Sequence, residues 1–419
     1  MIEKNAAKIG ILSLGCPRNL VDSESVLGRL TLKGYKVVEM EEADIGIVNT
    51  CAFIEDAKAE SVDAILDLID LKRKGKLKKI IVYGCLTERY KEKLVAELPE
   101  IDAFVGVPSL NHGLKRYPIT PQHYGYLKIC EGCINRCSYC IIPKIKPHFK
   151  SLKIYSVLER LEAFTKGKVS ELNIIGQDIT GYGKDLYGVY RLPKLLKRIV
   201  SKAKDIGWIR LLYLYPGRVS DELLGLIADS PVVCKYIDLP LQHINNRILK
   251  LMQRDMLKID ILRLIEKIRK RIPGVAIRTS LIVGFPSETE KEFAELSKFV
   301  EEVKFERLGV FIYSREEGTR AYDFKQQISQ KIKSQRFNAL MSRQQMVSEE
   351  INQKFLGKAI EVLIDEKEEG GTYLGRSQYD APEVDGQVFI KSKRLFKPGD
   401  FVQARITDTL EYDLVGEVN

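Results

Sequence analysis

No apolar run in this 419-residue chain approaches the roughly 20 residues that a membrane-spanning helix needs. A signal segment is not expected either, because the short apolar stretch that ends at Cys16 is followed at once by polar residues. Histidine is scarce as well: of only four, His112, His123 and His148 stand alone, as structural histidines do more often than metal ligands. These absences predict a cytoplasmic protein without a membrane anchor.

Charge is unevenly distributed along the chain, whose net charge is +10. Residues 357–419 contain 13 acidic and 8 basic side chains, a net charge of −5, which leaves +15 on the first 356 residues. A basic body favours an anionic partner such as nucleic acid or the ribosome, whereas an acidic terminal segment favours a basic partner. Ordinary solvated surface is the alternative interpretation of both.

Residues 1–118 alternate short apolar runs with amphipathic stretches, a pattern that predicts a parallel sheet covered by helices. We expect a flavodoxin-like N-terminal domain over this range. Ser23 is expected to cap its first helix, because it precedes an amphipathic stretch. The expected strands are KIGILSLG, DIGIVNT, KKIIVYG and DAFVGV.

Three of the eight cysteines follow strands of this region: Cys16 follows the first expected strand, Cys51 the second and Cys85 the third. The carboxyl ends of parallel strands lie at one edge of a sheet, where ligands bind. We therefore expect these thiols to converge in a three-thiolate site. Clustered cysteines in a chain without a signal segment indicate metal binding or catalysis rather than disulfides.

Residues 119–352 repeat the alternation in longer units, and five or more strand–helix units predict a full or partial TIM-type barrel. Residues 353–419 change to short strand-like runs broken by Gly, Pro and Asp, which predicts a small antiparallel β-barrel. The chain is therefore expected to be a multidomain α/β protein with three domains.

The stretch CEGCINRCSYC, residues 130–140, contains four cysteines. Structural zinc sites separate two CxxC pairs by ~12–20 residues, and bacterial ferredoxins use another order of spacings, so neither pattern fits. What remains is the C-x3-C-x2-C set of Cys133, Cys137 and Cys140, with Cys130 outside it. We expect Cys130 to be an inert buried thiol, and an extra reactive thiol is the alternative. Three thiolates on a cluster of four irons leave one iron open, as a catalytic zinc site keeps an open position.

This set, with Tyr139 just before its last cysteine, resembles the radical S-adenosylmethionine (SAM) enzymes. The resemblance implies that Cys133, Cys137 and Cys140 hold a [4Fe–4S] cluster whose open iron chelates SAM, and that Tyr139 packs near the adenine. A zinc loop or chance crowding of cysteines is the alternative interpretation.

Three later segments fall at the ends of expected barrel strands, where this family binds SAM: NIIGQDITGYG, DLPLQH and RTSLIVGFPSETEKEF. On that resemblance, Gln177, Gln242 and Arg278 are candidate SAM contacts. The alternative interpretation of each of the three is a polar residue with a structural role at the rim of the barrel.

A three-cysteine α/β domain before the barrel and a small β-barrel after it resemble the methylthiotransferases over essentially the whole chain. The resemblance implies that Cys16, Cys51 and Cys85 hold a second, auxiliary [4Fe–4S] cluster, and that the last barrel is a TRAM domain that grips the substrate. One branch of the family modifies adenosines in tRNA. The other, the RimO type, modifies an aspartate in the twelfth protein of the small ribosomal subunit.

Four segments resemble the RimO type: SLGCPRNLVDSE, LPLQH, YSREEGT and GRSQYDAPEVDG. The acidic terminal segment agrees, because it would repel RNA and attract a basic ribosomal protein. The implied reaction is radical methylthiolation of the aspartate β-carbon, because no side-chain base could deprotonate that unactivated C–H group. An electron donor and a sulfur source are implied partners, and direct tRNA binding is not expected.

Two alternatives stay open at this point. One is a tRNA adenosine methylthiotransferase, which predicts salt-sensitive RNA binding. The other is a zinc-binding ribosome or RNA factor without catalysis, which predicts a colourless protein that contains zinc and no iron.

Overall fold

The computed structural model describes residues 7–110 and 115–418, so His112 lies outside the described residues. Two compact units divide the chain. The first comprises residues 1–120, 128–152 and 314–322, and the second comprises residues 121–127, 153–313 and 323–419. The expected three-domain boundaries, after residues 118 and 352, stay a prediction. Within the described residues, no helix is long and apolar enough to cross a membrane.

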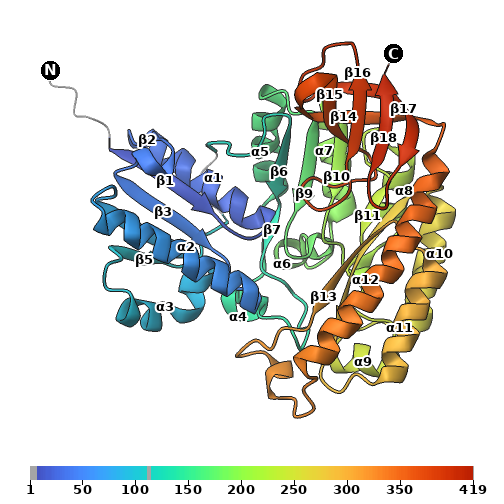
Figure 1. Ribbon diagram of the computed structural model, residues 1–419, viewed down its shortest axis with the longest axis horizontal. Coiled ribbons are helices and arrows are strands. Elements are labelled where there is room, and N and C mark those ends of the chain that lie inside the picture. Colours follow the sequence, from blue (N-terminus) through green and yellow to red (C-terminus); the bar gives the residue numbers. More distant parts are fainter. Residues whose placement is uncertain (1–6, 111–114, 419) are drawn as a thin grey trace. The chain divides into compact units, whose positions relative to one another are not determined.

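The first unit is built on a five-stranded parallel sheet with the order β2-β1-β3-β4-β5 (Figure 1). This is the flavodoxin-like order, so the predicted sheet is confirmed. Ile47 stands in register between Ile11 and Ile81, which continues an apolar row across the central strands. The strands are β1 (Lys8–Ser13), β2 (Lys36–Val37), β3 (Ile45–Thr50), β4 (Lys79–Gly84) and β5 (Ala103–Val105).

Three helices cover this sheet: α1 (Pro17–Leu32), α2 (Glu55–Arg73) and α3 (Cys85–Glu97). Leu27 of α1 packs into one apolar core with Ile9 and Ile47. Ile65 of α2 and Leu86 of α3 belong to a separate core. A parallel sheet needs apolar packing on both faces, and the two cores supply it.

Helix α1 begins earlier than the sequence predicts, at Pro17 with Cys16 as its N-cap residue. Ser23 lies inside the helix and is fully buried, with its hydroxyl hydrogen-bonded to Ser13 (2.7 Å) and Tyr83 (3.0 Å). The prediction that Ser23 caps the helix is therefore wrong. Proline fixes the start instead, because its φ and its missing N–H suit the first helical position.

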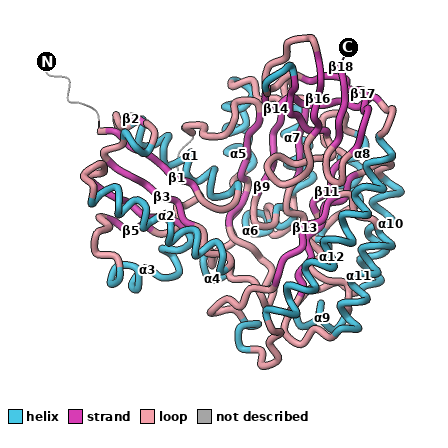
Figure 2. The backbone as a smooth tube through the Cα atoms, in the orientation of Figure 1, coloured by secondary structure: helices cyan, strands magenta, loops and turns pink. Residues whose placement is uncertain are grey.

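The second unit contains a partial barrel of six strands, as predicted (Figure 2). Two three-stranded sheets, β10-β9-β6 and β11-β12-β13, are joined by a bridge between Ile209 and Val233. The pairs β9–β10, β11–β12 and β12–β13 are parallel. The strands are β6 (Tyr124–Lys128), β9 (Glu171–Ile175), β10 (Trp208–Leu211), β11 (Tyr236–Asp238), β12 (Ala276–Val283) and β13 (Arg307–Ile312).

Helices alternate with these strands along the chain. The longest, α12, packs alongside α11 and β13 (Figure 1). The helices are α5 (Ile154–Lys166), α6 (Lys184–Tyr187), α7 (Leu192–Lys202), α8 (Asp221–Asp229), α9 (Asn246–Leu251), α10 (Lys258–Arg271), α11 (Glu290–Val303) and α12 (Gln330–Asn352).

The chain ends in a small closed barrel with the order β14-β15-β16-β18-β17, as predicted. One pair departs from the expected antiparallel arrangement: β16 and β18 run parallel, because β18 returns to lie between β16 and β17. The strands are β14 (Ala359–Lys367), β15 (Thr372–Ser377), β16 (Val388–Ser392), β17 (Phe401–Thr409) and β18 (Leu414–Val418).

Residues 376–385, which we name the latch segment, connect this small barrel to the partial barrel within the second unit. Each strand of the partial barrel supplies one side chain that bonds to the latch segment. These side chains are Tyr124 of β6, Glu171 of β9, Arg210 of β10, Tyr236 of β11, Arg278 of β12 and Arg307 of β13.

Most of these contacts involve buried charges. Arg307 donates to Asp380 from Nε at 2.8 Å, and both side chains are buried. Arg376 donates to Glu171 at 2.6 Å and to Asp365 at 2.7 Å. Taking such charges out of water is costly unless each keeps its partner, so the two barrels depend on one another for stability.

We predict that Arg307→Met destabilises the second unit by about 3–5 kcal/mol, because it leaves the Asp380 carboxylate buried without its main cation. The matched control is Arg271→Met, which removes an exposed ion pair with Asp229 at 2.9 Å and should cost at most about 1 kcal/mol. Trp208, the single tryptophan, reports unfolding, because its ring packs against Phe401 at 4.9 Å. Urea unfolding of each variant is followed by Trp208 fluorescence. If both variants shift the urea concentration at the unfolding midpoint by the same amount, the prediction is contradicted.

Candidate active site

The first cysteine triad lies where the sequence predicts: Cys51 and Cys85 come directly after β3 and β4, and Cys16 lies three residues after the end of β1. Parallel pairing of these three adjacent strands brings their carboxyl ends to one edge. The proximity is direct at Gly15, where an added Cβ would lie 2.8 Å from Cys51 Cβ and 3.0 Å from its Sγ. The three strand ends therefore meet at one edge, and a shared ligand for the three thiols stays a prediction.

Two of these thiols stand at helix N-termini. Cys16 is the N-cap residue of α1, and Cys85 is the first residue of α3. Exposed N–H groups and the helix dipole favour negative charge at this position. The two helices therefore stabilise thiolates, which are the form of cysteine that binds metals.

Polar side chains connect the loops that carry this triad. Asn19 donates from Nδ2 to the carbonyl oxygens of Leu14 (3.0 Å) and Thr50 (3.2 Å). The Ser61 hydroxyl accepts from the Cys51 N–H at 3.0 Å and donates to the Cys51 carbonyl at 2.9 Å. These bonds fix the backbone on both sides of the thiols before any ligand binds.

The second triad, Cys133, Cys137 and Cys140, lies on the loop after β7 (Cys130–Glu131), and all three residues are partly exposed. The Cys140 N–H donates to the Cys137 carbonyl at 3.1 Å, which forms a tight turn between them. Cys130 itself lies in β7 and is fully buried. The loop therefore presents three of its four cysteines and buries the other one.

This loop is packed onto the sheet of the first unit. Beyond it, the short helix α4 (Ile142–Ile145) places Ile141 and Ile145 in the same apolar core as Cys85 and Leu86. Both triads therefore belong to one compact unit.

Four buried charged side chains connect helix α1 to the loop of the second triad. We name Asp22, Lys128, Glu131 and Lys146 the buried tetrad. Lys128 contacts Asp22 and lies 2.5 Å from Glu131, and Lys146 contacts Glu131 and lies 3.9 Å from Asp22. Burial would raise the pKa of Glu131, but Lys128 and Lys146 outweigh it and lower the pKa to about 2. The tetrad thus forms a charge-balanced link inside the unit.

Residues 314–322 form a second link. Glu316 is buried and accepts from Arg89 at 2.8 Å, while Arg89 also donates to the carbonyl of Ala52, next to Cys51. In the same segment, the Ala321 N–H donates to the Ser138 carbonyl at 2.8 Å, within the loop of the second triad. The segment therefore holds the loops of both triads, and it contains most of the YSREEGT motif.

The thiols differ in acidity. Burial would raise the pKa of Cys16, but the Arg18 guanidinium, whose Nε lies 3.3 Å from the sulfur, outweighs it and the pKa is lowered. Burial raises the pKa of Cys85 to about 12 and that of Cys140 to about 12. Cluster binding at these two thiols must therefore release protons. The Arg18 charge also acts against the burial effect at Cys51 and Cys140, so it reaches both triads.

The donor chemistry of both triads fits the [4Fe–4S] clusters that the sequence predicts. Each offers three soft thiolates, and all eight cysteines, each within the described residues, are free of disulfides. Thiolates of such a cluster bind different irons, so they need not converge as closely as ligands of one ion. Within residues 7–110 and 115–418, no three His, Cys, Asp or Glu side chains are arranged around a single ion.

The expected SAM contacts other than Tyr139 lie in the second unit. Gln177 follows β9, and Gln242 follows β11 with a φ of +75°, a strained conformation for a residue other than glycine. Arg278 lies near the amino end of β12, where its guanidinium is held by Asp238 (3.2 Å) and Asp385 (3.3 Å). Their contact with SAM stays a prediction.

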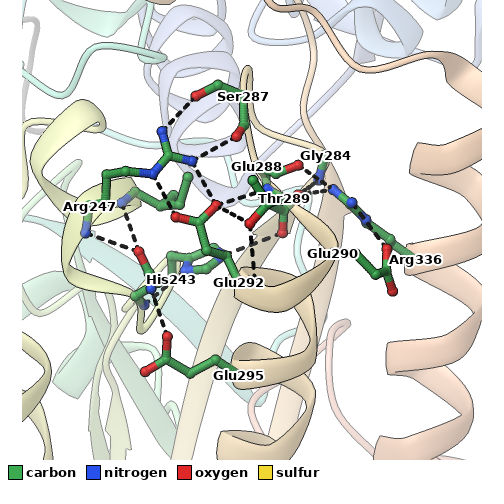
Figure 3. A network of polar contacts seen from close by, with 12 residues as sticks. His243, Arg247, Gly284, Ser287, Glu288, Thr289, Glu290, Glu292, Glu295 and Arg336 are labelled. Carbon is green, nitrogen blue, oxygen red and sulfur yellow. Dashed lines mark hydrogen bonds and ion pairs between the residues drawn. The ribbon is translucent and has the colours of Figure 1, made fainter.

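The carboxyl edge of β12 is a dense polar network (Figure 3). Arg247 binds both oxygens of Glu292, each at 2.6 Å, and Glu292 in turn caps α11 through Thr289. His243 is fully buried: its Nδ1 accepts from the Asn245 N–H at 3.0 Å, and its Nε2 faces Glu288 at 3.3 Å. These bonds fix the loop after β12 and give the buried His243 a structural role.

Sequence reasoning missed Arg18, the buried tetrad and the role of the latch segment, which it noted only as part of the GRSQYDAPEVDG motif. Pro17 was the available signal for Arg18, because a proline at the start of a helix places the residues that follow it in the first turn, beside Cys16. The other two depend on partners far apart in sequence and leave no local pattern.

We predict that Gly15→Ala displaces Cys51 and lowers iron retention by the first triad, because the added methyl group has no room and φ is +86° there. Gly34→Ala is the matched control: its φ is +90°, but no atom lies within 4 Å, so it isolates the backbone strain of about 1–2 kcal/mol. Iron content after anaerobic reconstitution checks the difference. Equal retention in the two variants would show that the contact with Cys51 is unimportant.

Three family models match the chain in succession. "Uncharacterized protein family UPF0004" matches residues 8–106, "Radical SAM superfamily" residues 127–300, and "TRAM domain" residues 356–418. These descriptions correspond to the sheet with the first triad, the loop and barrel with the second triad, and the closed terminal barrel.

Full-length relatives are also found. "Ribosomal protein uS12 methylthiotransferase RimO" of Clostridioides difficile (strain 630) is 46% identical, with 98% of each chain covered. The protein of the same name from Desulforamulus reducens is 47% identical, with 98% of this chain and 99% of the relative covered. Among solved structures, the radical SAM methyltransferase TsrM from Kitasatospora setae, with cobalamin and a [4Fe–4S] cluster bound, has a TM-score of 0.52. The two sequences are 13% identical, and the match covers 88% of this chain and 80% of the TsrM chain, which shows a shared fold.

These matches confirm the expected enzyme class and cofactors, SAM and [4Fe–4S] clusters, and they do not favour a tRNA-modifying enzyme or a zinc factor. The chain belongs to the RimO family of radical SAM methylthiotransferases.

Proposed function

We propose that this enzyme adds a methylthio group to the β-carbon of an aspartate in ribosomal protein uS12. The observation that carries the proposal is the match over 98% of the chain to relatives named as uS12 methylthiotransferases. On this proposal the enzyme acts in the cytoplasm, where ribosomes are assembled, and it requires an electron donor and a sulfur source.

Two cluster sites are part of the proposal. The SAM-binding cluster is assigned to Cys133, Cys137 and Cys140, and the auxiliary cluster to Cys16, Cys51 and Cys85. When bound, the clusters and SAM supply the radical, the sulfur and the methyl group, which no amino-acid side chain provides. The packing of both triads in one compact unit supports the assignment, because the substrate carbon must be accessible from both.

The remaining task of the chain is to bind, orient and exclude water. The N-termini of α1 and α3 favour the negative charge of a thiolate-bound cluster. We assign Tyr139 to the adenine of SAM, and Gln177 and Gln242 to its polar groups; the third candidate, Arg278, is instead paired with Asp238 and Asp385 near the amino end of β12. The strained backbone at Gln242 supports a functional role there, since strain is retained mainly at such sites.

The acidic charge of the terminal barrel is weaker support for a protein substrate than the amino-acid composition of residues 357–419 indicates. Asp365, Asp380 and Asp385 bind partners in the second unit, and so does Arg376. Of 13 acidic and 8 basic side chains in residues 357–419, this leaves ten acidic and seven basic. The acidic surplus that a basic ribosomal protein could meet is therefore smaller. The assignment of the substrate rests on the full-length relatives instead.

We predict that Cys130→Ala keeps the full iron content of about eight atoms, whereas Cys137→Ala and Cys51→Ala each lose about half. Cys130 is buried in β7, while the other two belong to different triads. Iron and sulfide analysis of anaerobically reconstituted protein measures this. Loss of half the iron from Cys130→Ala would overturn the assignment of ligands.

We predict that the reconstituted enzyme, given SAM, sulfide and a reductant without oxygen, adds one methylthio group to recombinant uS12. Total tRNA, treated in parallel, should stay unchanged. Mass spectrometry of both products tests the substrate directly. Modified tRNA beside unmodified uS12 would overturn the proposed function, and a protein that contains only zinc would overturn the enzyme class.

A further inference from the structure

Helix α7 carries a strongly basic outer surface. Its 11 residues include no acidic side chain and contain four exposed cations, which we name the basic face: Lys194, Lys197, Arg198 and Lys202. The opposite side of the helix is apolar and buried through Leu195, Leu196 and Ile199. The cations are therefore accessible from solvent, while the helix itself is anchored in the core of the second unit.

Three of these cations stand at a spacing that is unfavourable for a helix. Lys194, Arg198 and Lys202 are four residues apart, so their side chains are neighbours on one side of α7. Like charges at this spacing destabilise a helix. A row of them that is kept despite this cost indicates that the charge serves a contact outside the helix.

Internal partners balance little of this charge. Among residues 7–110 and 115–418, only Lys197 of the basic face forms an ion pair, at 2.8 Å from Glu222, and that pair is exposed on both sides. On α10, by contrast, Lys267 and Arg271 both pair with carboxylates of the neighbouring helix α8. The positive charge of α7 is therefore left largely uncompensated within the fold.

Two exposed tyrosines lie just before this helix, between further cations. Tyr187 and Tyr190 are 36% and 46% exposed. The Arg191 guanidinium lies 4.4 Å from the centre of the Tyr187 ring, and Lys184 Nζ lies 5.4 Å from that of Tyr190. Nucleic-acid-binding surfaces combine these two kinds of group, because rings stack on unpaired bases and cations bind phosphates.

The chemistry of the basic face selects RNA as its partner. Along α7 the cation row advances by about 6 Å per step, which is close to the separation of successive phosphates in an RNA strand. A basic ribosomal protein would be repelled here, so the substrate protein itself does not fit. A lipid surface does not fit either, because the apolar side chains of α7 are buried in the fold and not available for insertion.

We propose that the basic face binds phosphates of ribosomal RNA and so directs the enzyme to uS12 within the small ribosomal subunit in preference to the free protein. The choice of this RNA rests on the proposed function, since a ribosomal protein in its subunit lies against RNA. Phosphate contacts add affinity without reading a base sequence, and their strength falls as salt rises. Tyr187 and Tyr190 stack on unpaired bases at one end of the row.

The first test measures binding of the reconstituted full-length enzyme to purified small ribosomal subunits over a range of salt concentrations. In the α7 variant, Lys194→Gln, Arg198→Gln and Lys202→Gln are combined, because glutamine keeps the helix propensity and removes the charge. We expect the slope of log K against log salt to become less steep by about 3, one for each lost phosphate contact. Iron content and Trp208 fluorescence show that the variant is folded and loaded.

A matched control removes the same charge from another helix of the same unit. The α10 variant combines Lys267→Gln, Lys270→Gln and Arg271→Gln, all at exposed positions. Its salt slope should equal that of the wild type. The comparison separates a contact at α7 from a general effect of net charge.

The second test separates docking from chemistry. With small subunits whose uS12 is unmodified as the substrate, the α7 variant should raise KM about 10-fold or more at low salt and leave kcat unchanged. With free recombinant uS12, which brings no RNA, both constants should equal those of the wild type. Mass spectrometry of uS12 measures both reactions.

An unchanged salt slope in the α7 variant would overturn the proposal, and so would an equal decrease in the α10 variant. Binding of the wild type that survives ribonuclease digestion of the subunits would also overturn it, because the partner would then be an acidic protein. If the salt slopes follow the expectation but uS12 is modified in neither form, the proposed function fails while the RNA contact stands.

Discussion

The buried tetrad is the constraint on which the arrangement of the candidate site depends. Asp22 belongs to the helix that starts at Cys16, and Glu131 lies just before the loop of the second triad. Because Lys128 and Lys146 bridge the two carboxylates, neither element can shift without exposing a charge to an apolar interior. Breaking such a pair is expensive, so the tetrad restricts the distance between the triads more firmly than apolar packing alone.

Apolar packing and the 314–322 segment act in the same direction. Ile141 and Ile145 place the end of the second loop in a core that α2 and α3 share. Glu316 and Ala321 connect that loop to the backbone beside Cys51 through Arg89 and Ser138. A reaction that uses groups at two triads on one substrate carbon needs a fixed separation, and three independent kinds of contact supply it.

The sequence predicted the parts of this site that follow from regular secondary structure. Cys16, Cys51 and Cys85 were expected to converge because parallel strands end at one edge, and the three strands that precede them are indeed adjacent and parallel. Arg278 shows where such reasoning ends. Its place in the chain indicated a cofactor contact, but the register of β12 puts it beside Asp238 and Asp385, near the amino end of the strand. Contacts between residues that lie so far apart in the chain produce no periodic pattern and no characteristic spacing in the sequence.

The terminal barrel shows why charge composition needs a structure. In sequence, its acidic surplus is a property of residues 357–419 that predicts a basic partner. In the fold, Asp380 and Asp385 neutralise Arg307 and Arg278 of the same unit, so part of the surplus is internal. Those ion pairs close the amino ends of the barrel strands, whereas ligand sites of such barrels lie at the carboxyl ends. The GRSQYDAPEVDG motif is therefore explained by the joining of two barrels, and the residues that select the substrate are to be sought near the cysteine triads.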